Sequence, residues 1–435
     1  MTTMKDIFLI KGLNGKRSLR GSLQVSGAKN AALPALASAI LFKDPVNFKN
    51  IPYIEDIRAM KELLENLGGT TERISSDSWK IKASKLSKTE LDEKLAKHMR
   101  ASIVLTGPIL ARYKEVSFPH PGGCVLGERP LDMFLYAFQK MGATVNRNGN
   151  IYKISTKGKK LIGAEIFLHV PSHTVTETIM MAAILAEGKT VIKNCAMEPE
   201  IASLADFFVS CGANIKGAGT PTIEIIGTGL LNCGEKVYTT IPDRIEAGSF
   251  LILGALAGDN LTILDCNPLH LESLIGALRS AGVSLLILKS SITVTSRAIN
   301  NELNLHSTNI KTHEYPGFPT DLQAPMTVFL TQVAGESNVF ETIFDGRLNY
   351  ANDLIKMGAK INVWSKHNMT IKGPTALRGK ELDGPDIRAG LAYVLAAIIA
   401  KGRSVINNVH YIDRGYERIE ERLKKIGVDI ERVSN

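Results

Sequence analysis

A short pattern that occurs six times along the chain limits the folds open to it. In each copy a helical stretch ends at a glycine, and a small or branched residue then leads into an apolar strand. The six glycines are Gly68, Gly142, Gly212, Gly282, Gly358 and Gly427. A glycine just past a helix can adopt the left-handed conformation that turns the chain into a strand. The sequence therefore predicts six repeats of one α/β unit.

Each repeat also has a helical segment upstream that is apolar on most of its faces. The clearest examples are residues 31–41, 178–186, 250–258 and 390–400, each followed by a turn and a strand. A helix that is apolar all round is buried, whereas a helix with a polar stripe covers the outside. Each unit is therefore predicted to have an inner helix, an outer helix and strands between the layers.

The length of the chain, 435 residues, suits two domains of three units each. The divide is expected within residues 239–250, where the fourth unit begins. Two strand-like runs within residues 8–27 lie outside the first unit and could complete either domain. Because ligands favour clefts at domain interfaces, a site between two such domains is expected.

The composition indicates a globular protein of the cytoplasm. No apolar run reaches membrane-spanning length, and the first residues do not have the pattern of a signal peptide. The five cysteines show no C-x-x-C spacing, which favours reduced thiols over a disulfide framework or a zinc site. We expect no metal and no membrane partner.

The net charge of +9 has three possible meanings: a nucleic-acid partner, a solvated surface, or attraction of small polyanionic substrates. The lysines are scattered, and the densest basic run, residues 80–100, is interleaved with acids. No aromatic-rich basic motif accompanies it. The pattern favours a solvated surface over a nucleic-acid partner.

Charged residues recur at the starts of helices and the ends of strands in several units. Lys29 lies in the first turn of a helix that Ser26 and Gly27 can cap, where a cation opposes the helix dipole and suggests a bound anion. One such residue alone would be read as part of a surface salt bridge. Together they predict a cleft lined by Lys29, Arg100, Arg129, Arg347, Arg388 and Arg414. Arginine binds phosphate and carboxylate groups through two hydrogen bonds, so small anionic substrates are expected there.

Cys124 lies in an unusual place, the loop "PHPGGCVLGERP". Free cysteines usually lie in apolar cores, whereas this one follows two glycines and precedes Arg129 by five residues. Nucleotide-binding P-loop, Rossmann and zinc-protease motifs do not occur in the sequence.

Several motifs, taken in order, resemble those of the UDP-N-acetylglucosamine enolpyruvyl transferases, a branch of the enolpyruvyl transferase family. They are "SGAKNAALPALA", "MRAS", "PGGC", "FPTDLQA", "ETIFDGR", "DIRA" and "HYIDRGYERIE", and they extend over nearly the whole chain. The resemblance implies an α/β fold of two inside-out α/β barrels, each of three repeats, with the active site between them. One domain would comprise residues 29–242, and the second would combine 1–28 with 243–435.

The resemblance also implies the reaction. Phosphoenolpyruvate and UDP-N-acetylglucosamine would give the 3-O-enolpyruvyl sugar nucleotide and phosphate by addition and elimination, the first committed step of peptidoglycan precursor synthesis. No cofactor is implied, and we expect a monomer.

The roles implied by the resemblance are as follows. Cys124 would protonate C3 of phosphoenolpyruvate, and Asp321 would be the base at the sugar hydroxyl, with Lys29 and Arg414 also counted as catalytic. Phosphoenolpyruvate would contact Lys29, Asn30, Arg129, Arg347, Arg388 and Arg414. UDP-N-acetylglucosamine would contact Arg100, Arg129, Pro130, Leu131, Asp132, Met133, Ser172, His173, Asp321 and Ile343.

One segment departs from the family pattern. A turn resembling Ser-Val-Gly-Ala-Thr is usual at the nucleotide-binding loop, whereas this chain has "PSHTVTET", with Ser172 retained and His173, Thr174 and Val175 changed. Two alternatives remain within the fold: a transferase acting on shikimate 3-phosphate and a non-catalytic paralogue. The motif "SGAKN" and the loop cysteine argue against the first, and the retained Cys124 and Asp321 argue against the second.

Overall fold

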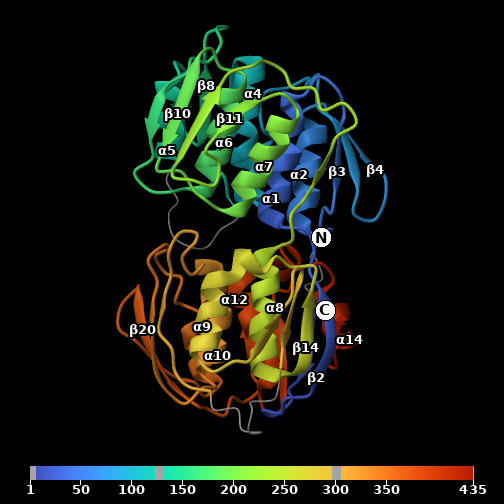
Figure 1. Ribbon diagram of the computed structural model, residues 1–435, viewed down its shortest axis with the longest axis vertical. Coiled ribbons are helices and arrows are strands. Elements are labelled where there is room, and N and C mark those ends of the chain that lie inside the picture. The colour runs from blue at the N-terminus through green and yellow to red at the C-terminus, as the bar shows by residue number, and fades with distance from the viewer. Residues whose placement is uncertain (1–5, 123–130, 296–304, 435) are drawn as a thin grey trace. The chain divides into compact units, whose positions relative to one another are not determined.

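The computed structural model describes residues 6–122, 131–295 and 305–434 (Figure 1). These residues fall into two compact units. The first barrel comprises residues 27–122 and 131–241, and the second barrel comprises residues 6–26, 242–295 and 305–434. The chain passes between the units after Ser26 and after Ile241, whereas the sequence-based boundaries lie after residues 28 and 242.

The apolar segments of the sequence form the inner helices of the two barrels. They are α1 (Lys29–Ser38), α4 (Thr106–Tyr113), α6 (His173–Ile184), α8 (Arg244–Ala257), α10 (Gln323–Leu330) and α12 (Ile387–Ile399). All residues of α8 after Arg244 and all residues of α12 after Ile387 are buried. The prediction of buried inner helices is confirmed.

The outer helices are amphipathic and end at the six glycines. They are α2 (Glu55–Asn66), α5 (Asp132–Lys140), α7 (Pro199–Ser210), α9 (Glu272–Ser280), α11 (Ala351–Lys356) and α14 (Ile419–Lys425). The φ angles of the glycines that follow lie between 88° and 108°, in the left-handed region. The predicted helix–glycine–strand unit is therefore confirmed in all six copies.

The strands form sheets around the inner helices. In the first barrel, one sheet has the order β13 (Val237–Thr239), β3 (Val46–Lys49), β5 (Trp79–Lys82), β4 (Thr70–Arg73). A second has the order β11 (Asn214–Lys216), β12 (Thr222–Ile226), β10 (Lys189–Lys193), β9 (Glu165–Phe167). A third has the order β6 (Glu115–Pro119), β8 (Ile151–Ser155), β7 (Thr144–Asn148).

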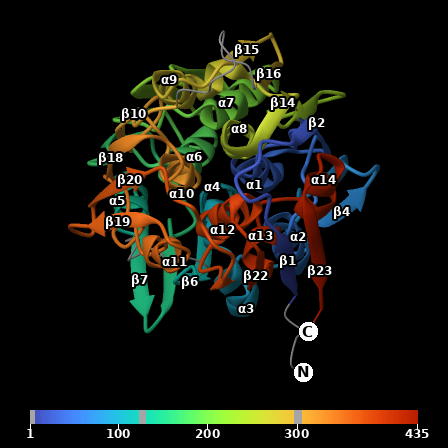
Figure 2. The same cartoon turned by 90° about the horizontal axis from the view of Figure 1, so that it is seen from below.

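The second barrel repeats this arrangement. One sheet has the order β15 (Leu285–Ile287), β16 (Ser291–Val294), β14 (Gly258–Leu264), β2 (Leu19–Gln24). Another has the order β17 (Ile310–Lys311), β18 (Gly335–Phe340), β20 (Asn368–Gly373), β19 (Lys360–Val363). The last has the order β21 (Glu381–Asp383), β22 (Arg403–Asn407), β1 (Ile7–Lys11), β23 (Asp429–Val433). In Figure 2, helices α8, α10 and α12 lie inside the ring of these sheets.

The two strands at the start of the chain complete the second barrel. Strand β2 pairs in parallel with β14, and β1 pairs antiparallel with both β22 and β23. In the other repeats the strand in the position of β1 follows the outer-helix strand directly in sequence, as β5 follows β4. In the sixth repeat this position is filled by β1, which lies at the start of the described residues.

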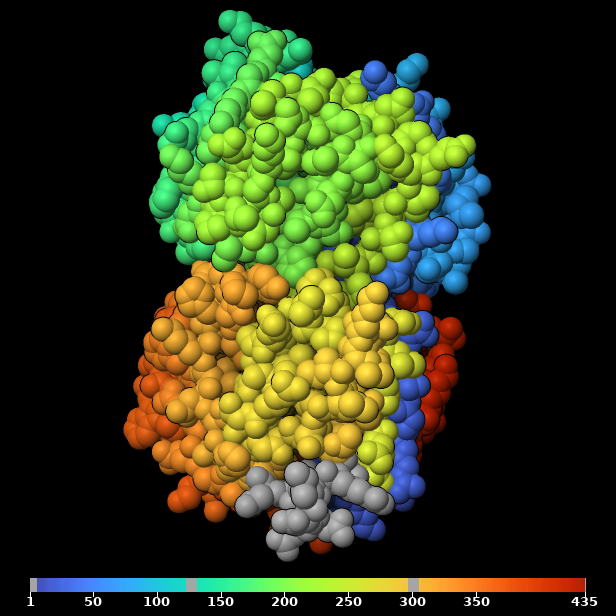
Figure 3. All heavy atoms as spheres, viewed as in Figure 1, coloured from blue at the N-terminus to red at the C-terminus, as the bar shows by residue number. Residues whose placement is uncertain are grey.

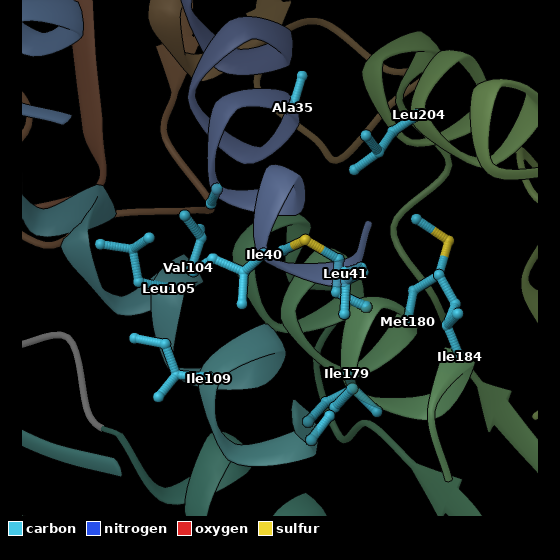
Figure 4. Close-up of a cluster of buried hydrophobic side chains, with 14 of the residues drawn as sticks. Ala35, Ile40, Leu41, Val104, Leu105, Ile109, Ile179, Met180, Ile184 and Leu204 are labelled. Atoms are coloured by element: carbon cyan, nitrogen blue, oxygen red, sulfur yellow. The ribbon is translucent and has the colours of Figure 1, made fainter. Parts of the chain in front are cut away.

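Each barrel has its own hydrophobic core. Figure 4 shows part of the first core, where side chains from α1, α4, α6 and α7 meet with those of two short 3₁₀ helices, η1 (Ala39–Leu41) and η2 (Arg100–Leu105). The labelled side chains, among them Ile40, Leu105 and Ile179, are buried. Residues 250–295 form much of the visible face of the second barrel in Figure 3. Among the described residues, no helix is both long enough and apolar enough to cross a membrane.

Candidate active site

In the second barrel, three predicted site residues form one polar cluster at the head of α10. Asp321 lies in the 3₁₀ helix η4 (Thr320–Leu322), directly before α10. Arg347 Nη2 donates to Asp321 Oδ1 at 2.9 Å, and Arg388 Nε lies 3.3 Å from the same oxygen. Both arginines are buried, with 4% and 7% of their surface exposed. Two buried cations thus converge on one carboxylate oxygen.

The charges of this cluster decide the ionisation of Asp321. Burial by itself would raise the pKa of the carboxyl group, but the charges of Arg388 and Arg347 outweigh burial and hold the pKa well below its usual range. Asp321 is therefore a carboxylate at neutral pH. Both guanidinium contacts fall on Oδ1, so they leave Oδ2 as the oxygen that can face a hydroxyl group.

Local structure fixes the position of Arg388. Asp386 caps α12, because its carboxylate accepts from the backbone N–H groups of Arg388 at 2.7 Å and Ala389 at 3.1 Å. The guanidinium of Arg388 donates through Nη1 to the hydroxyl of Tyr416 at 2.9 Å. Asp386 and Arg388 lie in the same sequence motif. In the structure Asp386 contacts the backbone at the start of the helix and not the guanidinium of Arg388.

Asp413, the acid next to Arg414, forms ion pairs within the second barrel. Arg414 directly follows the short helix α13 (His410–Asp413) and is half-buried. Asp413 binds Arg432 through both carboxylate oxygens, at 2.7 and 3.0 Å, and Arg432 also contacts Glu420. Asp413 therefore belongs to an ion-pair network that ties β23 to the rest of the second barrel.

Ile343 lies in the loop after β18, next to an acid that sequence reasoning did not single out. Its backbone N–H donates to the carboxylate of Glu341 at 2.9 Å. Since that N–H is already used, a backbone contact from Ile343 to a nucleotide would use its carbonyl oxygen. The motif "ETIFDGR" contained the signal for Glu341, a charged residue directly after a strand.

In the first barrel, Lys29 is the first residue of α1 and pairs with Asp56. Lys29 Nζ lies 2.7 Å from Asp56 Oδ2, and both side chains are largely buried. Sequence reasoning missed Asp56, although two acids, Glu55 and Asp56, begin α2. The ion pair holds the lysine at the start of the helix, and Asn30 follows half-buried.

The prediction that Ser26 and Gly27 cap α1 is wrong. The N-cap residue is Ala28, without a side-chain hydrogen bond. The backbone N–H of Ser26 donates instead to Glu246 Oε2 at 2.7 Å. Gly27 has another function: a Cβ atom there would lie 1.7 Å from the carbonyl oxygen of Asn50, so only glycine permits this close approach.

The remaining predicted residues of the first barrel that the structure describes lie at helix starts. Arg100 begins η2 and is half-buried. Leu131 is the N-cap of α5, and Asp132 and Met133 are its first two residues. Cys124, Arg129 and Pro130 lie outside the described residues.

The segment that departs from the family pattern forms the start of α6. Ser172 caps the helix, with its hydroxyl 3.4 Å from the N–H of Val175. His173 Nδ1 lies 3.3 Å from Glu177 Oε2. Within the described part of the chain, the buried atoms His173 Nε2 and Glu177 Oε1 have no hydrogen-bond partner.

His173 carries a proton at neutral pH. Burial lowers the pKa of the imidazole, but the charge and hydrogen bond of Glu177 outweigh burial. Together with the charges of Glu198 and Glu200, they raise the pKa of His173 to about 10. Sequence reasoning missed these three acids, although Glu177 directly precedes the apolar run at residues 178–186.

Four cysteines are buried free thiols: Cys195, Cys211, Cys233 and Cys266. Burial raises the pKa of all four thiols, of Cys195 to about 12 and of Cys266 to about 11. A thiol with a raised pKa is a poor nucleophile at neutral pH. These four side chains are therefore suited to packing rather than to chemistry.

Comparisons with known proteins agree over nearly the whole chain. The family model of EPSP synthase (3-phosphoshikimate 1-carboxyvinyltransferase) matches residues 13–423. UDP-N-acetylglucosamine 1-carboxyvinyltransferase 1 of Caldanaerobacter subterraneus subsp. tengcongensis is 42% identical over 414 residues, which cover 95% of this chain and 97% of that protein. UDP-N-acetylglucosamine 1-carboxyvinyltransferase of Desulfatibacillum aliphaticivorans is 41% identical over 421 residues, which cover 97% of this chain and 99% of that protein.

Solved structures show the same fold. The enolpyruvyl transferase NikO from Streptomyces tendae matches with a TM-score of 0.86 at 21% identity, covering 99% of both chains. EPSP synthase from Acinetobacter baumannii matches with a TM-score of 0.70 at 18% identity, covering 99% of this chain and 100% of that one. The fold of two inside-out α/β barrels is thereby confirmed. The chain belongs to the family of enolpyruvyl (carboxyvinyl) transferases, and its relatives at 41–42% identity identify it as a member of the UDP-N-acetylglucosamine 1-carboxyvinyltransferase branch.

Proposed function

We propose that this protein transfers the enolpyruvyl group of phosphoenolpyruvate to the 3-hydroxyl of UDP-N-acetylglucosamine and releases phosphate. The observation that carries the proposal is the cluster at the head of α10, where Asp321 lies between Arg347 and Arg388. A carboxylate suited to a hydroxyl group and two guanidinium groups suited to a substrate carboxylate meet there. The printed names of the relatives support UDP-N-acetylglucosamine as the acceptor.

The reaction would proceed in two steps. In the addition, Asp321 accepts the proton of the sugar 3-hydroxyl, the oxygen forms a bond to C2 of phosphoenolpyruvate, and the Cys124 thiol gives a proton to C3. In the elimination, the Cys124 thiolate takes a proton back from C3, the C2–C3 double bond forms again, and the bond from C2 to the phosphate oxygen breaks. The phosphate leaves with the electron pair of that bond, and the proton on Asp321 passes to phosphate or solvent.

Substrate binding would also make Asp321 a better base. The two arginines hold the pKa of its carboxyl group low, and a carboxylate with a low pKa is a weak proton acceptor. The carboxylate of phosphoenolpyruvate would share Arg347 and Arg388 and so weaken their hold on Asp321. Lys29, Asn30, Arg129 and Arg414 would bind phosphoenolpyruvate as well, chiefly its phosphate.

The sugar nucleotide would contact residues of both barrels. On the first barrel the proposed contacts are Arg100, Arg129, Pro130, Leu131, Asp132, Met133, Ser172 and His173, and on the second they are Asp321 and Ile343. In residues 171–178, the segment that departs from the family pattern, the imidazolium of His173 would offer a positive charge to the nucleotide. The reaction would supply peptidoglycan precursors in the cytoplasm, and a phosphonate epoxide of the fosfomycin type would inactivate it.

Phosphate release tests the proposal. Purified protein is given phosphoenolpyruvate with either UDP-N-acetylglucosamine or shikimate 3-phosphate, and inorganic phosphate is measured over time. We expect turnover with the sugar nucleotide alone. Turnover with shikimate 3-phosphate alone would favour a 3-phosphoshikimate 1-carboxyvinyltransferase. Turnover with neither acceptor would favour a non-catalytic paralogue.

A further inference from the structure

Glu341 is a buried carboxylate with an unusual set of partners. It directly follows β18 and is 0% exposed. Its Oε1 accepts from the backbone N–H groups of Ile343 at 2.9 Å and Phe344 at 3.2 Å. The hydroxyl of Thr320 donates to both carboxylate oxygens, at 2.9 and 3.0 Å. The donors in these contacts are two backbone N–H groups and one hydroxyl group, all of them neutral.

These partners belong to the two segments that carry the cluster around Asp321. Thr320 directly precedes Asp321 in η4, and Ile343 and Phe344 belong to the loop that leads to Arg347. The contact between Arg347 and Asp321 joins the same two segments a second time. One carboxylate thus fixes both the turn that carries the carboxylate base and the loop that carries its arginine.

We propose that Glu341 is a positioning residue that holds the Asp321 turn and the 343–347 loop in the arrangement needed for enolpyruvyl transfer. The inference rests on the proposed function. It adds a residue that does not touch the substrates but sets the distance between the groups that do. A misplacement of about 1 Å in a reacting group can cost about 100-fold in rate, so such a contact has a measurable effect on turnover.

Further hydrogen bonds hold the loop that follows β18, so the contribution of Thr320 can be tested separately. Thr342 donates through its backbone N–H to Thr312 Oγ1 at 2.8 Å and through its hydroxyl to the carbonyl of Thr312 at 2.6 Å. The backbone N–H of Glu341 donates to the carbonyl of His367 at 2.7 Å. The loop therefore keeps its backbone contacts when the Thr320 hydroxyl is removed, whereas the Asp321 turn loses its hydrogen bond to Glu341 and keeps its contacts with the arginines.

Conservative variants distinguish positioning from charge. In Glu341→Gln the amide oxygen can still accept from Ile343 and Phe344, and the amide NH₂ can donate to the Thr320 hydroxyl. In Thr320→Ser the hydroxyl is retained, whereas in Thr320→Val it is lost at nearly constant volume. In Glu341→Ala both segments lose their common partner.

The experiment measures two quantities on the full chain. The kcat comes from phosphate release with phosphoenolpyruvate and UDP-N-acetylglucosamine, and the Kd of the sugar nucleotide comes from calorimetry. For Thr320→Val we expect kcat to fall about 10–100-fold while Kd changes by less than about twofold. Thr320→Ser and Glu341→Gln should retain most of the turnover, whereas Glu341→Ala should lose turnover and bind the sugar nucleotide more weakly.

A matched control removes a hydroxyl hydrogen bond elsewhere in the same barrel. Thr262→Val breaks the 2.9 Å contact with Thr293 between β14 and β16 and should leave kcat unchanged. Wild-type kcat in Thr320→Val would overturn the inference while the proposed function stands, and so would equal losses in Thr320→Ser and Thr320→Val. A wild-type protein without turnover would overturn the proposed function and the inference together. If Glu341→Ala fails to fold, as thermal melting would reveal, the two Thr320 variants still decide.

Discussion

At the scale of single residues, two buried arginines of the second barrel share one oxygen of Asp321. A buried cation that loses its partner, or a buried anion that loses its cation, costs more than an exposed pair would contribute. The arginines therefore stabilise the carboxylate of Asp321, and they are also the groups proposed to bind the carboxylate of phosphoenolpyruvate. Substitutions here should affect binding and turnover more strongly than substitutions in surface ion pairs.

Arg347→Ala tests this view directly. The variant loses a charge-assisted contact to a buried anion, so kcat/KM should fall by a factor that corresponds to roughly 2–4 kcal/mol of transition-state binding. Arg347→Lys should restore only part of it, because lysine lacks the two-pronged geometry of the guanidinium. The control is Arg20→Ala, which breaks the exposed pair with Asp259 and should leave kcat/KM unchanged. An Arg347→Ala variant with wild-type kcat/KM would remove Arg347 from the site.

Cys124 should differ from the four buried thiols in its reactivity. If it is the proton donor, Cys124→Ser should nearly abolish turnover while sugar-nucleotide binding survives, because a hydroxyl is far less acidic than a thiol. Cys124→Asp should retain activity, with an optimum at lower pH, and should escape alkylation by a phosphonate epoxide. Cys211→Ser serves as the control, since burial raises the pKa of that thiol. Full activity in Cys124→Ser, or epoxide labelling of Cys211 in a peptide map, would contradict the role.

At the scale of elements, residues at the helix ends determine where the helices begin and end. Each outer helix ends at a glycine with positive φ, and three inner helices begin at a polar residue with a defined partner: Lys29 with Asp56 in α1, Ser172 before α6 and Asp386 before α12. The first group obeys local rules of backbone geometry. In the second group, Lys29 depends on a partner from another helix, Asp56, whereas Ser172 and Asp386 accept from backbone N–H groups of their own helices. The two groups should respond differently to substitution.

Alanine substitutions at two glycines test the effect of backbone strain separately from the effect of packing. Nothing lies within 4 Å of a Cβ added at Gly212, but its φ is 101°, so Gly212→Ala should destabilise the protein by about 1–2 kcal/mol. Gly276 is equally open but lies within α9 without positive φ, so Gly276→Ala should stabilise the helix by about 0.5–1 kcal/mol. Urea unfolding measures both changes. Equal signs for the two variants would contradict the argument.

The His173–Glu177 pair predicts a pH dependence of stability. The folded state raises the pKa of His173 to about 10, above the ordinary value of 6.5, so it holds the proton more tightly than the unfolded chain. The stabilisation is fully present below pH 6.5 and is lost as the pH rises toward 10. Urea unfolding at pH 6.5 and pH 9.5 should show the loss in wild-type protein and a smaller loss in His173→Gln. The exposed His313→Gln is the control, and an undiminished slope in His173→Gln would disprove the assignment.

At the scale of the whole molecule, both barrels carry cations proposed to bind the same two anionic substrates. Lys29 and Arg100 belong to the first barrel, and Arg347, Arg388 and Arg414 belong to the second. Like charges repel, whereas a shared anion attracts both sets. We therefore expect substrate to change how far apart the barrels are held in solution.

Small-angle scattering measures that change. Saturating UDP-N-acetylglucosamine should decrease the radius of gyration, and the forward scattering should correspond to a monomer of 47.3 kDa. UDP alone is the control, because it lacks the sugar that is proposed to contact Asp321, and it should compact the protein less. An unchanged radius with saturating sugar nucleotide would contradict the expectation.

The sequence by itself determined the repeats, the buried inner helices, the glycine caps and the residues of the family motifs. These features follow local rules: a helical period, a backbone angle that glycine adopts, and short runs with fixed spacing. The sequence also identified Asp321, Arg347 and Arg388, but not that all three meet at one oxygen.

Only the tertiary structure decided which groups lie together. Strand β1 pairs with β22, so Phe8 lies opposite Ile406, and no local signal links two segments so far apart in the chain. The same holds for Asp56 beside Lys29 and for Glu341 between Thr320 and Ile343. Ser26 had the local signal of a helix cap, but its backbone is held by Glu246 instead. Packing of distant segments overrides local preference wherever a buried polar group must find a partner, and most of the candidate site consists of such groups.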